Sequence, residues 1–389
     1  MSDKLRFKDK NGHDYPEWEN EILGKLCITE QKSKYPASYG KNDGLYPFIL
    51  SNTSNEMKYA DIYILNSESI IVNDGGEAYF RYINGKFAYS DHCIVLTTNE
   101  NTKYIYYYLD ANKKIINQKG FVGGGLKNID RNYLKSFIIK IPTTEEQQKI
   151  ADFLSTVDEK IENQKELVAN WEEIKKGLIK KIFSQEIIFK DENGQDYPEW
   201  DYSELGKYCY IQGGYAFKSS SFKTEGVPII KIANLQEGTI GLDKDSTVYY
   251  DSLAIDERFY VKQNDILIAM SGATTGKIGV YKSDRTALLN QRVGLFKNID
   301  TNRLYYKFLK YLLETDLYKT LMSGICVAGA QPNISPRDIE EMFFYIPSTE
   351  EQQKIADFLS TIDEKLDCEK NILNELTELK KGLLQRIFA

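Results

Sequence analysis

The chain has 389 residues, of which 42% are hydrophobic and 28% are charged, a composition typical of folded globular proteins and unlike collagen or low-complexity disorder. At about 150 residues per domain, this length predicts two or three domains. The formal net charge of −7 argues mildly against a protein that grips nucleic acid unaided.

The chain shows no sign of export or of membrane insertion. It has no run of about 18 apolar residues, and its first residues, MSDKLRFKDKNG, lack the apolar stretch of a signal peptide, so a cytoplasmic protein is expected. The five cysteines are odd in number, scattered and without a CxxC pair, which indicates reduced thiols. With only two histidines, a catalytic triad or a histidine-rich metal site is not favoured.

Two pairs of segments recur along the chain, which is therefore a tandem duplication. FKDKNGHDYPEW at 7–18 returns as FKDENGQDYPEW at 189–200, and TEEQQKIADFLST at 144–156 returns unchanged at 349–361. The inserts between the repeats share little sequence, and the second is longer by 23 residues. Two near-identical frames with different inserts predict one architecture that carries two recognition specificities.

The inserts, 1–141 and 185–345, are predicted to be mixed α/β domains, which makes the chain α+β. Strand character is found at 69–73, 87–98, 227–233, 265–272 and 277–282, and helical character at 103–118 and 303–321. The first insert is slightly basic and the second is acidic. If DNA is the ligand, a partner is expected to supply much of the grip on its phosphates, while this chain reads bases.

The segments 142–184 and 346–389 are each predicted to form one long helix. A hydroxyl residue and two glutamates mark each start, and apolar residues at spacings of three and four give each helix a single apolar stripe. A helix of about 40 residues cannot bury such a stripe alone, so the two copies are expected to pair as an antiparallel coiled coil with pseudo-two-fold symmetry. Gly177 and Gly382 are expected to permit a kink or a close helix crossing.

A glycine-rich turn separates two predicted strands in each insert. In the second insert it reads SGATTGK at 271–277, which is not a Walker A loop, because only three residues separate Gly272 from Gly276 and Ile278 follows the lysine. The matching segment of the first insert is NDGGEAYFRYINGK at 73–86. Both are interpreted first as turns between strands; alternatively, their polar side chains contact DNA.

SDHCIVL at 90–96 and LNQRVGL at 289–295 occupy similar places in the two inserts. Asp91, His92 and Cys93 look like a nucleophile cluster, but adjacent residues of a strand point to opposite faces and the second copy reads Asn-Gln-Arg, so catalysis is not expected. Two interpretations carry equal weight. The residues are mixed polar positions at a strand start, or they face a groove, where Gln and Arg suit adenine and guanine edges.

Asp-Glu-Lys recurs at 158–160 and 363–365 on the long helices, where a salt-bridged face explains it better than a nuclease-like set. The chain has no NPPY or DPPY tetrapeptide, no glycine-rich cofactor fingerprint and no Walker motif. No catalytic residue, cofactor or metal ion is therefore expected in this chain.

The duplicated IPxTEEQQKIADFLSTxDEK, followed by KKGLxxxIF, resembles the specificity subunits of Type I restriction–modification systems, and the resemblance spans essentially the whole chain. DILIAMSGATTGKIGV, LLNQRVGLF and AQPNIS in the second half also resemble the target-recognition domains of this family. The first half departs from the pattern, with NDGGEAYF and GGGLKNID in these places.

The resemblance implies a non-catalytic, DNA-binding subunit with recognition domains at 1–141 and 185–345 and spacer helices at 142–184 and 346–389. Each domain would read one half of a bipartite, asymmetric site in double-stranded DNA, and the antiparallel helices would set the spacer. In the family, two methyltransferase subunits dock on the helices, bind S-adenosylmethionine and methylate adenine. Two ATP-dependent restriction subunits can join them, and no membrane is involved.

Two sets of candidate residues follow. Polar side chains of the turns, the strand starts and the segments before each long helix are the candidate DNA contacts: Asn73, Arg81, Tyr82, Lys86, His92, Lys127, Ser271, Thr274, Thr275, Lys277, Gln291, Arg292 and Gln331. Apolar side chains of the helix stripes are the candidates for methyltransferase docking and coiled-coil packing: Ile150, Phe153, Leu154, Val157, Ile161, Trp171, Ile355, Phe358, Leu359, Ile362, Leu366 and Leu376.

Two other hypotheses remain open. One is an enzyme with its active site in an insert, against which the lack of any shared acid–base constellation speaks. The other is a protein-only coiled-coil scaffold, or an inactive specificity allele, without selectivity for DNA. The weak basicity of the chain is compatible with this second alternative.

Overall fold

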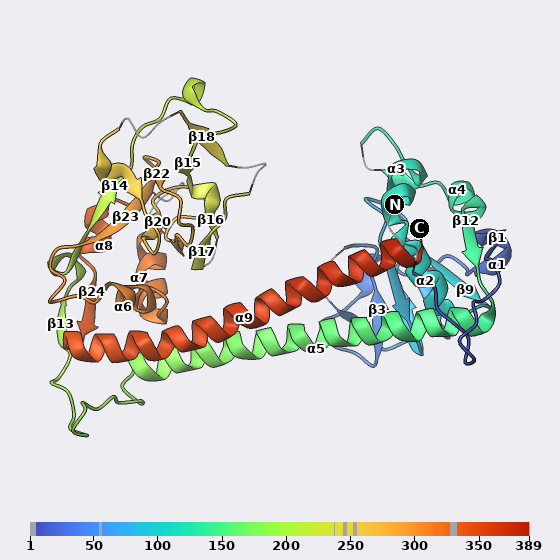
Figure 1. Ribbon diagram of the computed structural model, residues 1–389, viewed down its shortest axis with the longest axis horizontal. Coiled ribbons are helices and arrows are strands. Elements are labelled where there is room, and N and C mark those ends of the chain that lie inside the picture. The colour runs from blue at the N-terminus through green and yellow to red at the C-terminus, as the bar shows by residue number, and fades with distance from the viewer. Residues whose placement is uncertain are drawn as a thin grey trace. The chain divides into compact units, whose positions relative to one another are not determined.

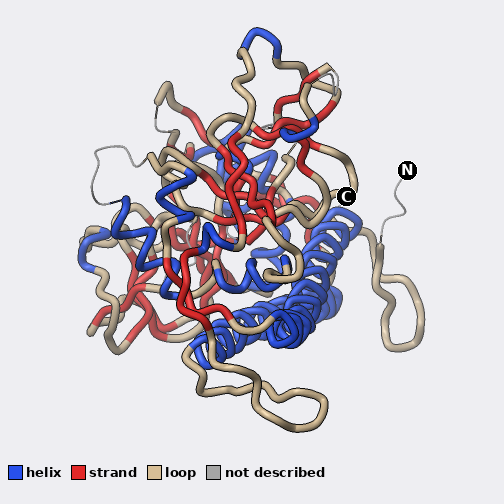
Figure 2. Tube along the Cα trace, turned by 90° about the vertical axis from the view of Figure 1, so that its left-hand side faces the viewer, coloured by secondary structure: helices blue, strands red, loops and turns tan. Residues whose placement is uncertain are grey.

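The computed structural model describes residues 5–53, 57–125, 127–236, 238–243, 247–251, 255–326 and 333–388. Its contacts divide the chain into two compact units (Figure 1). Unit 1 comprises Met1–Leu167 with Glu369–Ala389, and unit 2 comprises Val168–Cys368. Each unit thus contains one insert and a part of both long helices. The rest of the chain consists mainly of strands, loops and short helices (Figure 2).

Unit 1 is built on two four-stranded sheets. Their strand orders are β2-β9-β6-β7, antiparallel throughout, and β4-β3-β8-β5, in which β3 and β8 are parallel. The strands are β1 (Glu19–Ile22), β2 (Cys27–Thr29), β3 (Tyr46–Ile49), β4 (Lys58–Ala60), β5 (Leu65–Asn66), β6 (Ser69–Asn73), β7 (Phe80–Ile83), β8 (Lys86–Tyr89), β9 (Cys93–Thr98), β10 (Phe121–Val122), β11 (Asn128–Ile129) and β12 (Ile138–Ile141). The helices are α1 (Leu23–Leu26), α2 (Thr102–Ala111), α3 (Lys113–Gly120) and α4 (Arg131–Ser136).

Unit 2 repeats this plan and enlarges it. The order β14-β23-β20-β21 matches the first sheet of unit 1 and is extended by β17 and β16, while β18-β15-β22-β19 matches the second sheet. The strands are β13 (Asp201–Glu204), β14 (Cys209–Gly213), β15 (Val227–Ile230), β16 (Leu235–Gln236), β17 (Gly238–Ile240), β18 (Val248–Tyr250), β19 (Tyr260–Val261), β20 (Ile266–Ala269), β21 (Ile278–Val280), β22 (Ala287–Leu289), β23 (Val293–Asn298) and β24 (Phe343–Ile346). The helices are α6 (Tyr306–Leu312), α7 (Asp316–Cys326) and α8 (Pro336–Glu340). The added pair of strands lies within the longer of the two inserts.

The two long helices are α5 (Thr144–Phe183, 40 residues) and α9 (Thr349–Ile387, 39 residues). In unit 1, Gln164 of α5 donates to the carbonyl oxygen of Glu369 at 3.0 Å, and Asp158 pairs with Lys380 at 2.6 Å. In unit 2, Lys175 pairs with Asp363 at 2.9 Å. Within unit 1 the helices are therefore antiparallel, since the earlier residue of α5 contacts the later residue of α9. Among the described residues, none of the helices is apolar over a length that could cross a membrane.

Each unit completes its core with the long helix of the other half of the sequence. The core of unit 1 includes Ile150 and Leu154 from α5 together with Leu384 and Phe388 from the end of the chain. The core of unit 2 includes Ile355 and Leu359 from α9 together with Ile179 and Ile182 from the end of α5. The expected mixed α/β inserts and long paired helices are confirmed.

Several predicted elements are broken in the structure. The strand predicted at 87–98 is divided into β8 and β9, which belong to different sheets. Between them the backbone N–H of Asp91 donates to the carbonyl of Tyr35 at 2.8 Å, and that of Cys93 donates to the carbonyl of Ser90 at 3.1 Å. The helices predicted at 103–118 and 303–321 are likewise each divided in two, α2 with α3 and α6 with α7.

The close helix crossing expected at the glycines of the long helices is not found at either position. Both α5 and α9 continue through Gly177 and Gly382 as single helices. A Cβ atom built on either glycine would meet nothing within 4 Å, so neither glycine marks a close crossing of the helices.

Candidate nucleic-acid interface

Three loops that are distant in sequence meet at one end of the β2-β9-β6-β7 sheet in unit 1. Asp74 N donates to the carbonyl oxygen of His92 at 3.1 Å, and Ile129 N donates to that of Asp74 at 2.9 Å. Gly76 N also donates to the carbonyl of Lys127 at 2.8 Å. These backbone bonds join 74–76, 91–92 and 127–129 into a single surface element, here named junction 1.

The corresponding loops of unit 2 meet in the same way. Met270 N donates to the carbonyl oxygen of Arg292 at 2.9 Å, and Ile334 N donates to that of Met270 at 3.0 Å. Ser271 and Asn333 form an isolated antiparallel bridge, as Gly75 and Asn128 do in unit 1. The segments 270–272, 291–292 and 333–334 are named junction 2. Backbone bonds, which do not depend on side-chain identity, therefore fix the same loop arrangement beneath two different sets of side chains.

Two of the candidate DNA contacts are held inside unit 1. Asn73 is 2% exposed at the end of β6. The Arg81 guanidinium donates to the carbonyl oxygens of Leu50 and Asn52, both at 2.8 Å, and also to Asn52 Oδ1 at 3.0 Å. These bonds tie the loop after β3 to β7, which is a structural role.

The other candidates of unit 1 are more accessible. Lys86, His92 and Lys127 are exposed, with 68% of the His92 side chain open to solvent. Tyr82 is half-buried, and Lys103 lies 5.4 Å from the centre of its ring. Burial raises the pKa of the Tyr82 hydroxyl to about 12, so it stays a neutral hydrogen-bonding group at physiological pH. Arg81, Tyr82 and Lys103 line a cleft of about 410 Å³.

The glycine turn of unit 2 places its polar residues unequally. Gly272 and Gly276 have φ values of +83° and +82°, a conformation that glycine adopts without strain. The Thr275 hydroxyl donates to the carbonyl of Gly272 at 2.6 Å and so stabilises the turn. Lys277 is exposed, as are Gln291 and Arg292 in the neighbouring loop. Gln331 lies outside the described residues.

Some buried polar atoms without a hydrogen-bond partner lie in these loops. Of six such atoms among the described residues, Asp91 Oδ1, Ser271 Oγ and Thr274 Oγ1 belong to the junction loops or to the adjoining turn, and the other three, in Tyr15, Thr247 and Asn298, lie elsewhere. Because most buried polar groups in folded proteins are paired, unpaired ones are typical of sites that await a ligand, water or ion.

Asn128 and Asn333 also belong to the junctions, although neither is among the candidate DNA contacts chosen from the sequence. Both are exposed, and each lies beside the glycine turn through an isolated bridge. The signal that could have identified them is the Asn-Ile pair that precedes each long helix at 128–129 and 333–334.

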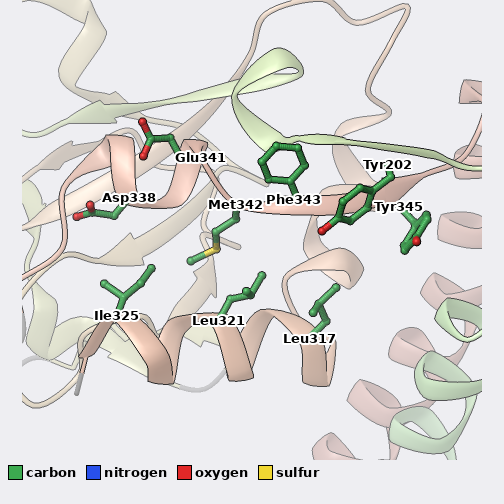
Figure 3. Close-up of a pocket in the computed structure, with 9 residues that line it drawn as sticks. All are labelled: Tyr202, Leu317, Leu321, Ile325, Asp338, Glu341, Met342, Phe343 and Tyr345. Carbon is green, nitrogen blue, oxygen red and sulfur yellow. The ribbon is translucent and has the colours of Figure 1, made fainter. Parts of the chain in front are cut away.

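A separate cleft of about 480 Å³ in unit 2 lies between α7, α8 and the β13–β24 ribbon. Figure 3 shows Leu317, Leu321 and Ile325 of α7 facing Met342 across it. Its carboxylates are already engaged. The Asp338 carboxylate accepts from Ser335, and the Glu341 carboxylate pairs with Arg337 at 2.6 Å. The lining offers no acid–base pair for catalysis.

The helix-stripe candidates divide by burial. Buried residues are Ile150, Leu154, Val157, Ile161, Ile355, Leu359 and Leu366, and half-buried ones are Trp171, Ile362 and Leu376. Phe153 and Phe358 are each 37% exposed. They pack edge to face on Phe7 and Phe189, with ring centres 5.5 and 5.8 Å apart, so the two frames present matching aromatic pairs.

Known proteins with similar sequences point to one family. The family model described as Type I restriction modification DNA specificity domain matches residues 15–170 and 197–378. The Type I restriction enzyme MjaVIII specificity subunit of Methanocaldococcus jannaschii is 27% identical over 98% of this chain and 95% of its own length. The EcoAI specificity subunit of Escherichia coli is 30% identical over 51% of this chain and 34% of its own.

Solved structures share the fold. The crystal structure of the Type I restriction–modification system S subunit from M. genitalium aligns with a TM-score of 0.66 at 21% identity, covering 100% of this chain and 99% of that one. A chain from a structure of Type I system assembly and conformational transition aligns with a TM-score of 0.53 at 17% identity, covering 97% and 99%.

Proposed function

The chain belongs to the Type I restriction–modification DNA specificity family, and on that premise we propose that it reads a bipartite DNA sequence, one half-site per unit. The observation that carries the proposal is the repeated junction. One backbone arrangement presents Asp91 and His92 in unit 1 but Gln291 and Arg292 in unit 2. A scaffold that keeps its loops and changes its side chains is suited to reading two different half-sites.

Junction 2 has the side chains that direct base reading requires. Arg is the usual bidentate partner of guanine O6 and N7, and Gln is that of adenine N6 and N7. Both Gln291 and Arg292 are exposed, and their loop is held by backbone bonds to Tyr215 and Met270. In junction 1, His92 and Lys127 take this role, while Asn73 and Arg81 support the loops.

Other subunits supply what this chain lacks. Its net charge of −7 is poorly suited to neutralising DNA phosphates, which usually dominate affinity. The proposal therefore assigns the phosphate grip, S-adenosylmethionine and adenine methylation to two methyltransferase subunits, and cleavage to two ATP-dependent restriction subunits. This chain is non-catalytic, and the complex acts in the cytoplasm.

The repeated helix starts are the proposed docking surfaces for the methyltransferase subunits. Within the thirteen identical residues, Glu146 and Gln147 and their repeats Glu351 and Gln352 are buried, so internal packing accounts for these positions. Other identical positions are exposed, including Asp152 with Phe153 and their repeats Asp357 with Phe358. Identical exposed side chains in two otherwise different units favour two copies of one partner protein.

The helices α5 and α9 are proposed to set the spacer between the half-sites. A helix of 40 residues is about 60 Å long, which is long enough to span two half-sites one DNA turn, or about 34–36 Å, apart. Lengthening α5 and α9 by one heptad each is therefore expected to lengthen the preferred spacer. An unchanged spacer in a chain that still binds its methyltransferase would contradict this role.

The test of the function is methylome sequencing of a host that expresses this chain with its neighbouring methyltransferase, against a host that lacks only this chain. A new bipartite methyladenine motif is expected. Replacing 1–141 with the same region of a relative should then change one half-site and leave the other. If the complex assembles but no motif is found, the protein-only scaffold or an inactive allele explains the chain better.

A further inference from the structure

Arg6 fills a binding slot for a guanidinium group in unit 1. Arg6 Nε and Nη2 donate to the Glu146 carboxylate at 2.9 and 3.1 Å. Nη2 also donates to the carbonyl oxygens of Tyr15 and Pro16, at 3.3 and 2.8 Å, and the guanidinium carbon lies 5.4 Å from the centre of the Trp18 ring. Glu146 is fully buried, so slot 1, formed by these four partners, matches the charge, the fork geometry and the flat face of arginine.

The repeat builds the same frame in unit 2 from Glu351, Trp200, Tyr197 and Pro198, here named slot 2. Trp200 Nε1 donates to Glu351 Oε2 at 3.0 Å, as Trp18 Nε1 donates to Glu146 Oε2 at 3.0 Å.

The surroundings of the two slots agree as well. Lys354 Nζ donates to the carbonyl of Lys190 at 2.7 Å, as Lys149 Nζ donates to that of Lys8 at 2.8 Å. The same lysines lie over the rings of Tyr197 and Tyr15, at 5.8 and 5.3 Å from the ring centres. The walls of the slot are therefore common to both halves.

The arginine itself is missing from slot 2. Ile188 stands where the first half has Arg6, and its side chain points to solvent, since the residue is 63% exposed. Tyr197 is half-buried, whereas Tyr15 is buried.

Glu351 is consequently a buried carboxylate without a counter-charge. It is 3% exposed, and within the described part of the chain its carboxylate accepts a hydrogen bond from Trp200 and pairs with no Lys or Arg. Burial raises the pKa of Glu351, and the Trp200 hydrogen bond offsets this only in part. Buried charges in proteins are normally paired, so this arrangement is incomplete by itself.

We propose that slot 2 is a binding site for the arginine side chain of a partner protein, which takes the place that Arg6 occupies in slot 1. The inference rests on the internal repeat and does not depend on the proposed reading of DNA. A lysine fits less well. Its ammonium is a point charge, which makes no pair of parallel bonds to a carboxylate and has no flat face to stack on the indole ring. Glu199 is the sequence repeat of Glu17, which pairs with Arg6 at 3.8 Å in slot 1.

The experiment uses the full chain labelled with ¹⁵N at tryptophan. Its three tryptophans give three indole signals, which Trp→Phe variants assign. N-acetyl-arginine amide, which carries the side chain on a protein-like backbone, is titrated in, with N-acetyl-lysine amide at equal ionic strength as the control. The arginine compound is expected to shift the Trp200 indole signal saturably, and to leave that of Trp18 in place because Arg6 already occupies slot 1. Free arginine is expected to bind no more tightly, whereas tighter binding would indicate a site for the free amino acid.

Two variants make the test decisive. Glu351→Gln should weaken binding roughly tenfold or more, since it removes the charge from the paired bonds. Ile188→Arg should fill slot 2 with an arginine of the chain itself. The variant should then have a higher melting temperature and a shifted Trp200 signal without ligand, and it should no longer respond to the arginine compound. Ile188→Gln is its matched control. An unresponsive Trp200 signal, an equal response to the lysine compound, or an Ile188→Arg chain that leaves the Trp200 signal and the melting temperature unchanged would each overturn the proposal.

Discussion

Lys175 on α5 lies 2.9 Å from Asp363 on α9, and the same pair recurs with the helices exchanged, since Lys380 on α9 lies 2.6 Å from Asp158 on α5. Lys175 and Lys380 are repeats of each other, as are Asp158 and Asp363. The first pair lies in unit 2 and the second in unit 1. The Asp-Glu-Lys segments thus join the helices through their aspartates, as the salt-bridged interpretation predicted.

Removing Lys175 should destabilise the chain more than removing its repeat. The Lys175 ammonium pairs with both Glu314 and Asp363, whose side chains are 22% and 18% exposed, whereas Lys380 pairs with Asp158, whose side chain is 34% exposed. Lys175→Met leaves two partly buried carboxylates without this partner, so a loss of about 2–4 kcal/mol is expected, against about 1 kcal/mol for Lys380→Met. Thermal unfolding of both variants checks the order, and equal losses would contradict it.

The Asp363 cluster should make the chain sensitive to acid. Burial acts to raise the pKa of Asp363, but the ammonium groups of Lys310 and Lys175 outweigh it and hold the pKa below its ordinary value of 3.8. A lowered pKa in the folded chain means that the ionised aspartate adds stability above pH 3.8, and that this stability is lost as the pH falls through the lower folded value.

Asp363→Asn should therefore lower the melting temperature at neutral pH, and the difference from the unmodified chain should shrink below about pH 4. Melting temperatures measured across this range provide the check. A difference that stays constant down to pH 2 would show that the charge of Asp363 is not the cause.

Glu146 and Glu351 should respond in opposite ways to the same substitution. Glu146→Gln leaves Arg6 facing a neutral amide in a buried slot, and a loss of roughly 3 kcal/mol is expected. Glu351→Gln removes a buried charge that has no cation beside it in the described residues, so the variant should be as stable as the unmodified chain or more stable. Thermal unfolding of the two variants at pH 7 compares them directly, and equal destabilisation would contradict the difference between the slots.

On the proposed function, Arg292→Ala and Gln291→Ala should each relax the half-site read by unit 2 and leave the other half-site unchanged. Each lost base contact is expected to reduce discrimination by about 1–3 kcal/mol. Methylation of a randomised DNA library by the assembled complex measures both half-sites at once. Arg258→Ala, which removes an exposed arginine of unit 2 outside junction 2, serves as the control. A change in both half-sites would contradict one half-site per unit.

The long helices and the duplicated frame could be predicted from the sequence, because residue spacing and repeated segments indicate them directly. The helix predicted at 142–184 is α5 at Thr144–Phe183, and the strand predicted at 69–73 is β6. The break between β8 and β9 could not be foreseen, because the two strands pair with strands of different sheets and the backbone N–H of Asp91 between them donates to Tyr35, far earlier in the chain.

The same limit applied to the candidate site. Arg81 was a candidate DNA contact because it is a cation near a glycine turn. In the structure it donates to backbone carbonyls of the loop after β3, and no sequence motif indicates these contacts. The meeting of the three loops in each junction is also a product of tertiary backbone bonds. Residue types named the candidates, and only the folded chain shows which of them reach solvent.

The packing of Phe388 on Tyr104 and Tyr108, with ring centres 5.7 and 5.3 Å apart, has a consequence for synthesis on the ribosome. Unit 2 takes its share of α5 from residues already made, so it can close once α9 has begun to emerge. Unit 1 is synthesised first, but its core also contains Leu384, Ile387 and Phe388. The apolar side chains around Tyr104 and Leu154 are therefore covered only after these residues have been made. Throughout translation this half keeps an unfinished apolar surface, which makes it the part of the nascent chain that most needs protection from aggregation.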